Sequence, residues 1–354
     1  MRKGRLTDKG ELMKEKARVA LIFGGEGSER EVSLAGAKFV LPLIDREKYE
    51  VVPTLITQSG EWLVFRDGAP FPTDMSRGIP AFPTRRGFTL SGEIIKIDCA
   101  IPLLHGTRGE DGIIQGLLAS AGIAFVGSDA YAGSLAMDKA FTKTVASSLG
   151  IPTVRGHLLI DGSATHTKEG AIAAAEADFG YPMFVKPARE GSSVGAATAR
   201  DREELDLAID SAIAASDGRA LIEEYIDNRV ELECAYLGAC GKQLFTSIGE
   251  ITTEGFYDYG EKYAEDSKAR VSPSSKYEDI WGGVIRDWSR KIVEMLGVRQ
   301  LARLDYFLSG DRLYFNELNT FPGFTEASLY PALIARCGID PKELIELLIQ
   351  DTLC

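Results

Sequence analysis

The sequence has few of the residues that mark a metal centre, an export route or a membrane anchor. Its 354 residues include three histidines and five cysteines, and the cysteines are scattered with no C-x-x-C pair. This spacing argues against a zinc site and a disulfide framework, and it favours a reducing compartment. No run approaches the roughly 18 apolar residues of a membrane span, and the charged N-terminus lacks an apolar signal core. We therefore expect a cytoplasmic protein without a membrane partner.

Positive charge is also in short supply. The chain has 52 acidic and 40 basic residues, a net charge of -12, and no long Lys/Arg run. Because this field repels a polyanion, no nucleic-acid partner is expected. The G-x-x-x-x-G-K-S/T pattern is missing, which argues against a P-loop nucleotide site. The glycines at 24–27 lack the G-x-G-x-x-G spacing of a dinucleotide site, so we expect them to shape a substrate loop.

What is present is the composition of a globular protein of the α/β class. The apolar share is 45% and the charged share 26%, and the length suits two or three domains. Strands and helices alternate in the first part, whereas paired strands followed by helices give the last part an α+β character. The predicted parts are a flexible N-terminal extension (1–17), an open α/β domain (18–127), a central domain (128–222) and a C-terminal domain (223–354).

Local patterns predict the elements of these parts. A buried strand at 18–25 leads through glycines into a helix at 31–44, and a second strand, helix and strand follow at 95–106, 109–122 and 123–128. Asp201 with Glu204 three residues later is the pattern of a capping box, which predicts a helix start. The segment at 252–275 is long, polar and rich in glycine and tyrosine. Long loops of this kind are often lids, so we interpret it as a cover for an active site.

A predicted hairpin at 301–318 carries the most informative polar residues. Side chains alternate faces along a strand, so Arg303 and Asp305 share one face, and Glu317 and Asn319 share a face of the partner strand. Counting through the turn at Ser309-Gly310-Asp311 sets Asp305 opposite or diagonal to Glu317. Two carboxylates and an amide oxygen suit Mg²⁺ with a nucleotide phosphate. The alternative is an ordinary solvated strand face with an ion pair.

Two lysines beside small residues are candidates for phosphate binding in an otherwise acidic chain. Lys186 ends a strand just before the loop AREGSSVG at 188–195, whose free backbone amides can close over phosphate oxygens. Lys139 lies near the start of its own helix. Each lysine taken alone is more often a surface residue, but together they favour a nucleotide site that is not a P-loop.

Seven motifs in order resemble those of the D-alanine:D-alanine ligase family, which has the ATP-grasp fold. The resemblance extends from about residue 18 to 350 and leaves the first 16 residues outside it. It implies ATP-dependent joining of two D-alanines through an acyl phosphate, for peptidoglycan precursor synthesis. The motifs are REVSL (30–34), HGTRGEDG (105–112), MDK (137–139), FVKPAREGSSVG (184–195), YDYGEKY (257–263), RLDY (303–306) and NELNTFPGFT (316–325).

The resemblance also implies roles for single residues. Glu317 is implied to bridge two Mg²⁺ (or Mn²⁺) ions, with Asp305 and Asn319 as further ligands. Arg303, with the amide of Gly323, is implied to hold the oxyanion of the tetrahedral intermediate. The implied ATP contacts are Lys139, Phe184, Lys186, Glu223, Glu224, Ile226 and Glu231.

The same resemblance implies how the substrates and the lid are held. Glu31 is implied to bind the first substrate's ammonium group and to form a hydrogen-bonded triad with Ser192 and Tyr263 that pins the lid. Lys262 is implied to reach the phosphate that is transferred. The second substrate is implied to lie against His105, Ser328 and the Leu329 backbone, and the protein is expected to be a homodimer. For His105 the alternative is a structural loop histidine.

Three rival interpretations stay open. The nearest are related ligases that make D-alanyl-D-lactate or D-alanyl-D-serine. Tyr263 argues against the lactate type, and Leu329, where the serine type is expected to have an arginine, argues against the serine type. Another ATP-grasp ligase would share the metal-binding residues and lysines but lack Glu31, Ser192 and Tyr263. A catalytically silent paralogue would have lost Lys186 or the hairpin residues Arg303, Asp305 or Glu317. All of these residues are present.

Overall fold

The structure of the protein is a computed structural model that describes most of the chain. Ser192, Lys262 and Tyr263 lie outside the described residues, as do residues 253–269 and 274 of the predicted lid loop. Within the predicted N-terminal extension, strands β1 (Arg5–Leu6) and β2 (Leu12–Met13) pair with each other. The described residues are 5–6, 12–13, 15–65, 75–191, 194–252, 270–273 and 275–354.

A seven-stranded sheet organises the N-terminal part of the described chain, in the order β8-β7-β6-β5-β4-β3-β9. The sheet is parallel at one end, where β3 pairs with β4 and β9, while the strands from β4 to β8 are antiparallel neighbours. The elements are β3 (Ala17–Gly24), α1 (Arg30–Val40), β4 (Tyr49–Ile56), β5 (Trp62–Val64), η1 (Met75–Arg77), β6 (Ile79–Thr84), β7 (Gly87–Leu90), β8 (Glu93–Lys96), β9 (Cys99–Pro102), α2 (Ile113–Ser120) and α3 (Ala130–Met137).

A four-stranded antiparallel sheet follows, in the order β10-β13-β11-β12. Helices α5 and α6 pack on it and share its hydrophobic core. The predicted capping pattern is confirmed, because the Asp201 carboxylate accepts the Glu204 N–H at 2.9 Å where α6 begins. The elements are α4 (Lys139–Ser148), β10 (Gly156–Ile160), α5 (Lys168–Asp178), β11 (Met183–Pro187), β12 (Ala197–Ala199), α6 (Arg202–Ala215) and β13 (Arg219–Glu224).

The C-terminal part forms a third large sheet among the described residues, with the order β17-β16-β14-β18-β19 and with β15 paired to β14. Helix α8 packs its apolar side, which includes Ile285 and Ile292, against this sheet. The elements are β14 (Val230–Ala239), β15 (Lys242–Phe245), β16 (Gly249–Thr252), β17 (Arg270–Pro273), α8 (Ser275–Leu296), β18 (Gln300–Ser309), β19 (Arg312–Asn319), α9 (Leu329–Ala335) and α10 (Pro341–Leu353).

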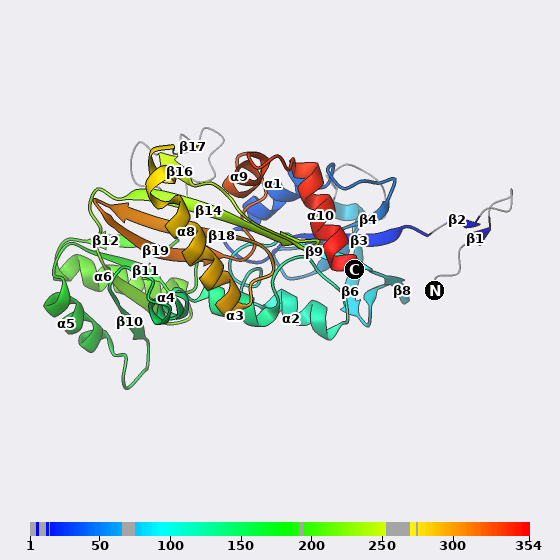
Figure 1. Ribbon diagram of the computed structural model, residues 1–354. Coiled ribbons are helices and arrows are strands. Elements are labelled where there is room, and N and C mark those ends of the chain that lie inside the picture. The colour runs from blue at the N-terminus through cyan, green and yellow to red at the C-terminus, as the bar shows by residue number, and fades with distance from the viewer. Residues whose placement is uncertain are drawn as a thin grey trace.

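The C-terminal helices of the chain pack beside its N-terminal strand and helix. Figure 1 shows the red C-terminal helices α9 and α10 beside the blue N-terminal elements, while the green strands β10 to β12 lie at the opposite end. The long strands β14, β18 and β19 run between the two ends (Figure 1). One core cluster accordingly joins β3, α1, β14, β18, α9 and α10. The polar face of the β18–β19 hairpin thus lies where all three parts of the chain can contribute residues.

Two details of the predicted fold differ from the structure. The strand expected at 123–128 is only an isolated bridge between Ala100 and Phe125. The short antiparallel strands β5 to β8 were not predicted. Among the residues that the structure describes, no helix is both long and apolar enough to cross a membrane.

Candidate active site

The hairpin has the register that the sequence predicts. Asp305 lies opposite Glu317, and Arg303 lies opposite Asn319. Arg303 donates to both carboxylate oxygens of Asp305, from Nε at 2.8 Å and from Nη2 at 2.7 Å. Its Nε also lies 3.2 Å from Glu233 Oε1 on β14. The guanidinium is therefore fixed between two carboxylates, and although burial alone would lower the pKa of Arg303, these charges raise it well above its usual value.

A β-bulge in the second strand brings an additional polar residue to this face. The pairing passes from Asp305–Glu317 to Tyr306–Phe315, so Asn316 is left without a partner opposite it. Neighbouring residues of a regular strand point to opposite faces, but here Asn316 and Glu317 both line the same cleft. The Asn316 Oδ1 atom accepts from Lys186 Nζ at 3.1 Å. Asn316 is thus a site residue that the sequence analysis missed.

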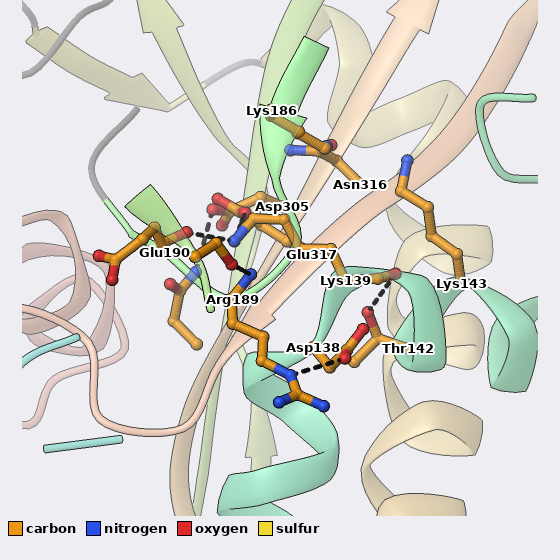
Figure 2. Close-up of polar contacts among 12 residues, drawn as sticks. Asp138, Lys139, Thr142, Lys143, Lys186, Arg189, Glu190, Asp305, Asn316 and Glu317 are labelled. Carbon is orange, nitrogen blue, oxygen red and sulfur yellow. Dashed lines mark hydrogen bonds and ion pairs between the residues drawn. The ribbon is translucent and has the colours of Figure 1, made fainter. Parts of the chain in front are cut away.

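The first cleft lies between the central sheet and the C-terminal sheet, with about 770 Å³ of space including its open mouth. Figure 2 shows Lys139 reaching from α4 to this region, where its Nζ lies 3.5 Å from Glu317 Oε2 and donates to the Glu190 carbonyl. The two lysines in its lining, Lys139 and Lys186, are groups that can bind nucleotide phosphates. The predicted residues that the structure brings together here are Lys139, Phe184, Lys186, Glu231, Arg303, Asp305 and Glu317.

Three predicted nucleotide contacts lie outside the lining of this cleft. Glu223 is buried behind Lys186, with Lys186 Nζ 2.9 Å from its Oε2. Glu224 forms a two-point ion pair with Arg155, at 2.9 Å for both contacts. Ile226 is half-buried just after β13. Glu224 and Ile226 are therefore not among the residues that line the cleft, although Glu224 ends β13, the strand next to β11.

A second cleft of about 720 Å³ adjoins the first, and Arg303 and Glu317 line both. His105, Gly323, Ser328 and Leu329 meet here as predicted. The Ser328 hydroxyl contacts the Thr325 hydroxyl at 2.7 Å and accepts the Thr325 N–H at 2.8 Å. Two adjoining binding regions thus share one arginine and two glutamates, Glu233 and Glu317.

His105 is a neutral imidazole in this cleft. Its Nδ1 lies 3.2 Å from the Phe321 carbonyl oxygen, which can only accept, so Nδ1 carries the proton. Burial lowers the pKa of His105 to about 4, with the Phe321 contact opposing this in part. Near neutral pH the histidine offers an acceptor nitrogen, Nε2, and not a positive charge.

The structure does not bring Glu31 to either cleft, which corrects the sequence-based prediction. Glu31 is exposed on α1, on the same side as the exposed Ala35 and Lys38, while Val32, Gly36 and other residues of the opposite side are buried. Glu29, two residues earlier and just before the helix begins, is 5% exposed and lines the second cleft. A Cβ atom added at Gly191 would lie 2.8 Å from the Glu29 carboxylate, so a side chain there would force that carboxylate to move.

Glu110 is a further acidic residue of the second cleft that the sequence analysis did not single out. Its two oxygens accept the N–H groups of Gly106 at 3.0 Å and Phe321 at 3.2 Å. Burial, reinforced by the negative charge of Glu29, raises the pKa of Glu110 to about 8. The carboxyl group therefore ties the N-terminal loop to the C-terminal loop while holding a proton near neutral pH.

This shift predicts a measurable pH dependence of stability. Between the ordinary pKa of 4.5 and about 8, the folded protein holds a proton on Glu110 that the unfolded chain has released, so rising pH lowers the free energy of unfolding. Relative to Glu110→Gln, the wild type should lose up to about 1.4 kcal/mol per pH unit in this window. Urea unfolding at pH 5, 6, 7 and 8 measures it, with Glu31→Gln as the control. A difference between wild type and Glu110→Gln that is constant over this range would contradict the assignment.

Comparison with known proteins places this geometry in a family. The protein-family model described as D-ala D-ala ligase N-terminus matches residues 18–128. A second family model, described as D-ala D-ala ligase C-terminus, matches residues 145–350. A D-alanine--D-alanine ligase of Caldicellulosiruptor bescii is 39% identical over 351 residues, covering 95% of this chain and 94% of that protein. One of Deinococcus radiodurans is 36% identical over 343 residues, covering 95% and 98%.

Solved structures agree with the sequence comparison. The VanG D-Ala:D-Ser ligase from Enterococcus faecalis superposes with a TM-score of 0.85 at 32% identity, covering 96% of this chain and all of that chain, 100%. The D-alanine-D-alanine ligase from Coxiella burnetii superposes with a TM-score of 0.82 at 28% identity, covering 96% and 95%. The ATP-grasp fold predicted from the resemblance is confirmed, and this chain belongs to the D-alanine–D-alanine ligase family.

Proposed function

We propose that this protein is an ATP-dependent ligase that joins two D-alanines into D-alanyl-D-alanine, a precursor of peptidoglycan. The observation that carries the proposal is the pair of adjoining clefts that share Arg303 and Glu317. One cleft is lined by two lysines and suits a nucleotide, and the other combines Glu29 with a neutral histidine and a serine. Phosphoryl transfer and amide formation then take place at one junction between them.

In this proposal the first cleft holds ATP. Lys139 and Lys186 bind its phosphates, as ammonium groups that reach the cleft from α4 and β11. Phe184 and Glu231 lie along the same cleft and suit the base and the ribose. The loop after Lys186, which contains Ser192, closes over the phosphates with its backbone amides.

The hairpin residues fit a magnesium ion that is bound together with a nucleotide. Among the described residues there is no cluster of three or more His, Cys, Asp or Glu that could hold a metal on its own. Asp305 and Glu317 are opposite each other, with Asn319 beside them, and Mg²⁺ in nucleotide sites commonly takes one or two carboxylates and completes its shell with phosphate oxygens and water. Two Mg²⁺ (or Mn²⁺) ions held by these residues would neutralise charge on the transferred phosphoryl group.

The second cleft holds the amino acids. Glu29 receives the ammonium group of the first D-alanine. The carboxylate of this D-alanine attacks the γ-phosphorus of ATP to give an acyl phosphate and ADP. The amine of the second D-alanine then attacks the acyl carbon, and phosphate leaves. Arg303 and the Gly323 amide stabilise the oxyanion that forms, and Ser328 with the Leu329 backbone receives the second carboxylate. The lid roles of Lys262, Ser192 and Tyr263 remain predictions from the resemblance, with Glu29 in place of Glu31.

The rival substrate for the second position is D-serine. It deserves a test because a D-Ala:D-Ser ligase superposes at the TM-score of 0.85 given above. Leu329, an apolar residue that lines the second cleft, offers no hydrogen bond to a serine hydroxyl and so favours D-alanine. A homodimer and a cytoplasmic location, to which the five free thiols add support, belong to the same proposal.

The deciding experiment is phosphate release from ATP and Mg²⁺ with products identified by mass. D-Alanine alone should support turnover and give the dipeptide, while L-alanine should give none. Turnover that requires D-serine or D-lactate would keep the mechanism and replace the second substrate. Silence with every amino acid would contradict the proposed function.

A further inference from the structure

Behind the first cleft lies a buried chain of alternating charges. The Glu223 carboxylate contacts two ammonium groups, with Lys143 at Oε1 and Lys186 at Oε2, the latter at 2.9 Å. Lys186 continues the chain to Asn316 Oδ1 at 3.1 Å. The side chain of Glu223 is 2% exposed, that of Lys143 8% and that of Lys186 9%. Buried charges of this kind are costly unless paired, so this arrangement is specific.

Four elements build this chain. Lys143 lies one turn after Lys139 on α4, and Figure 2 shows both lysines rising from that helix. In the β11–β13 pair, Glu223 lies opposite Phe184 and diagonal to Lys186, so both charged residues face the same side of the sheet. The bulge in β19 supplies Asn316. A shift of any one of these four elements would therefore change the contacts between the side chains of this charged group.

The members of the chain differ in their access to the cleft. Lys186 and Asn316 line it, whereas Glu223 and Lys143 do not. Lys186 therefore has two competing partners: the buried carboxylate behind it and a phosphate group in front of it. A phosphate that takes the Lys186 ammonium leaves Glu223 with Lys143 as its cationic partner among the described residues.

We propose that Lys143 is a positioning residue for the nucleotide site, which neutralises Glu223 so that Lys186 is released to the phosphates of ATP. The inference rests on the proposed function and extends it to a residue that does not contact the nucleotide. Two properties of the group agree with it. Burial, and then the charge of Lys186, lower the pKa of Lys143 to about 8, which leaves it mostly protonated at pH 7. The two ammonium groups outweigh burial and lower the pKa of Glu223, so its carboxylate stays ionised.

The test compares how much the phosphates contribute to binding in matched variants. The readout is the ratio of the Kd of adenosine, from competition, to the Kd of Mg²⁺·AMP-PNP, from isothermal titration calorimetry. This ratio cancels contacts to the base and ribose. Lys143→Met should reduce it about 10- to 100-fold, because Lys186 is then the remaining cation on a buried carboxylate. Lys168→Met, which removes an ion-paired lysine from α5, should leave it unchanged.

A second variant separates positioning from simple loss of structure. In Lys143→Met/Glu223→Gln the Glu223 carboxylate no longer holds Lys186. The ratio of the two Kd values should therefore rise at least about fivefold relative to Lys143→Met. An unchanged ratio in Lys143→Met, or no recovery in the double variant, would overturn the inference. If Lys143→Met melts below the assay temperature, Lys143→Gln takes the same test. A wild type that binds Mg²⁺·AMP-PNP no more tightly than adenosine would instead refute the proposed nucleotide site.

Discussion

Turnover should fall by at least about 10³-fold when Glu317 is replaced by glutamine, with little change in the melting temperature. Glutamine keeps the shape and one acceptor oxygen but removes the negative charge of Glu317, which lines both clefts as Glu233 also does. That charge balances Lys139 and, in the proposed function, would help to hold the metal ions. Steady-state phosphate release with D-alanine measures the loss.

The matched control for this variant is Glu231→Gln. Glu231 lines the same first cleft but is paired with Arg229 at 3.2 Å, and it lies opposite Phe307 of β18, whereas Glu317 lies opposite Asp305. The Glu231→Gln variant should have a raised KM for ATP and a kcat within a fewfold of that of the wild type. Binding of Mn²⁺ with ADP, followed by electron paramagnetic resonance, should weaken in Glu317→Gln alone. A Glu317→Gln enzyme that keeps a tenth of its turnover would remove the metal assignment.

The second large effect should distinguish two glutamates that are two residues apart. Glu29→Gln should lower kcat/KM for D-alanine about 10²- to 10³-fold, because a buried carboxylate that receives an ammonium group is replaced by a neutral amide. For Glu31→Gln, kcat/KM for D-alanine should stay within about twofold of wild type, since an exposed charge away from the binding clefts contributes little. Initial rates at low D-alanine measure both, and thermal melting checks that each variant folds.

The outcomes of this pair exclude each other. A loss confined to Glu31→Gln would restore the sequence-based prediction and contradict the position of Glu29 at the second cleft. Equal losses in both variants would show that the helix start as a whole, and not one carboxylate, is needed. Addition of a D-alanine analogue without its ammonium group should inhibit Glu29→Gln and the wild type with similar Ki.

The hairpin was predictable because its signals are local. Apolar residues at every second position of β18, with a turn at Gly310, fix both the faces and the register. The bulge changes this rule at one point, and the sequence does carry its mark: the buried apolar residues of β19 are two apart at Leu313 and Phe315, then three apart at Leu318. A break in the alternation at that point identifies Asn316 as the additional residue.

The error at Glu31 has a similar origin. Residues 31, 35 and 38 follow the helical repeat of the exposed side of α1, whereas Val32, Gly36 and Val40 follow the buried side. Periodicity alone therefore places Glu31 in solvent. It does not place Glu29, which precedes the helix and is directed by the loop and by its neighbours at Gly106 and Gly191.

The short antiparallel strands of the N-terminal sheet were missed for lack of length. Strands β5 to β8 contain three to six residues each, too few to show a period clearly. Their one strong local signal is the turn between β7 and β8, where Ser91 and Gly92 both have positive φ, at 48° and 87°. A two-residue loop with that geometry is a hairpin turn. Long-range features such as the Lys143–Glu223 contact leave no comparable local signal.

The shared core of the first and last elements has a consequence for synthesis. Leu21 and Phe23 of β3 belong to the same buried cluster as Leu344 and Leu348 of α10. Domains usually begin to fold from the N-terminus while the ribosome is still elongating the chain. Here the first large sheet to emerge keeps part of its apolar face uncovered until the final helix leaves the exit tunnel. Nascent chains stalled before α10 should therefore be bound by chaperones, and termination before α10 should yield aggregation and not a shortened enzyme.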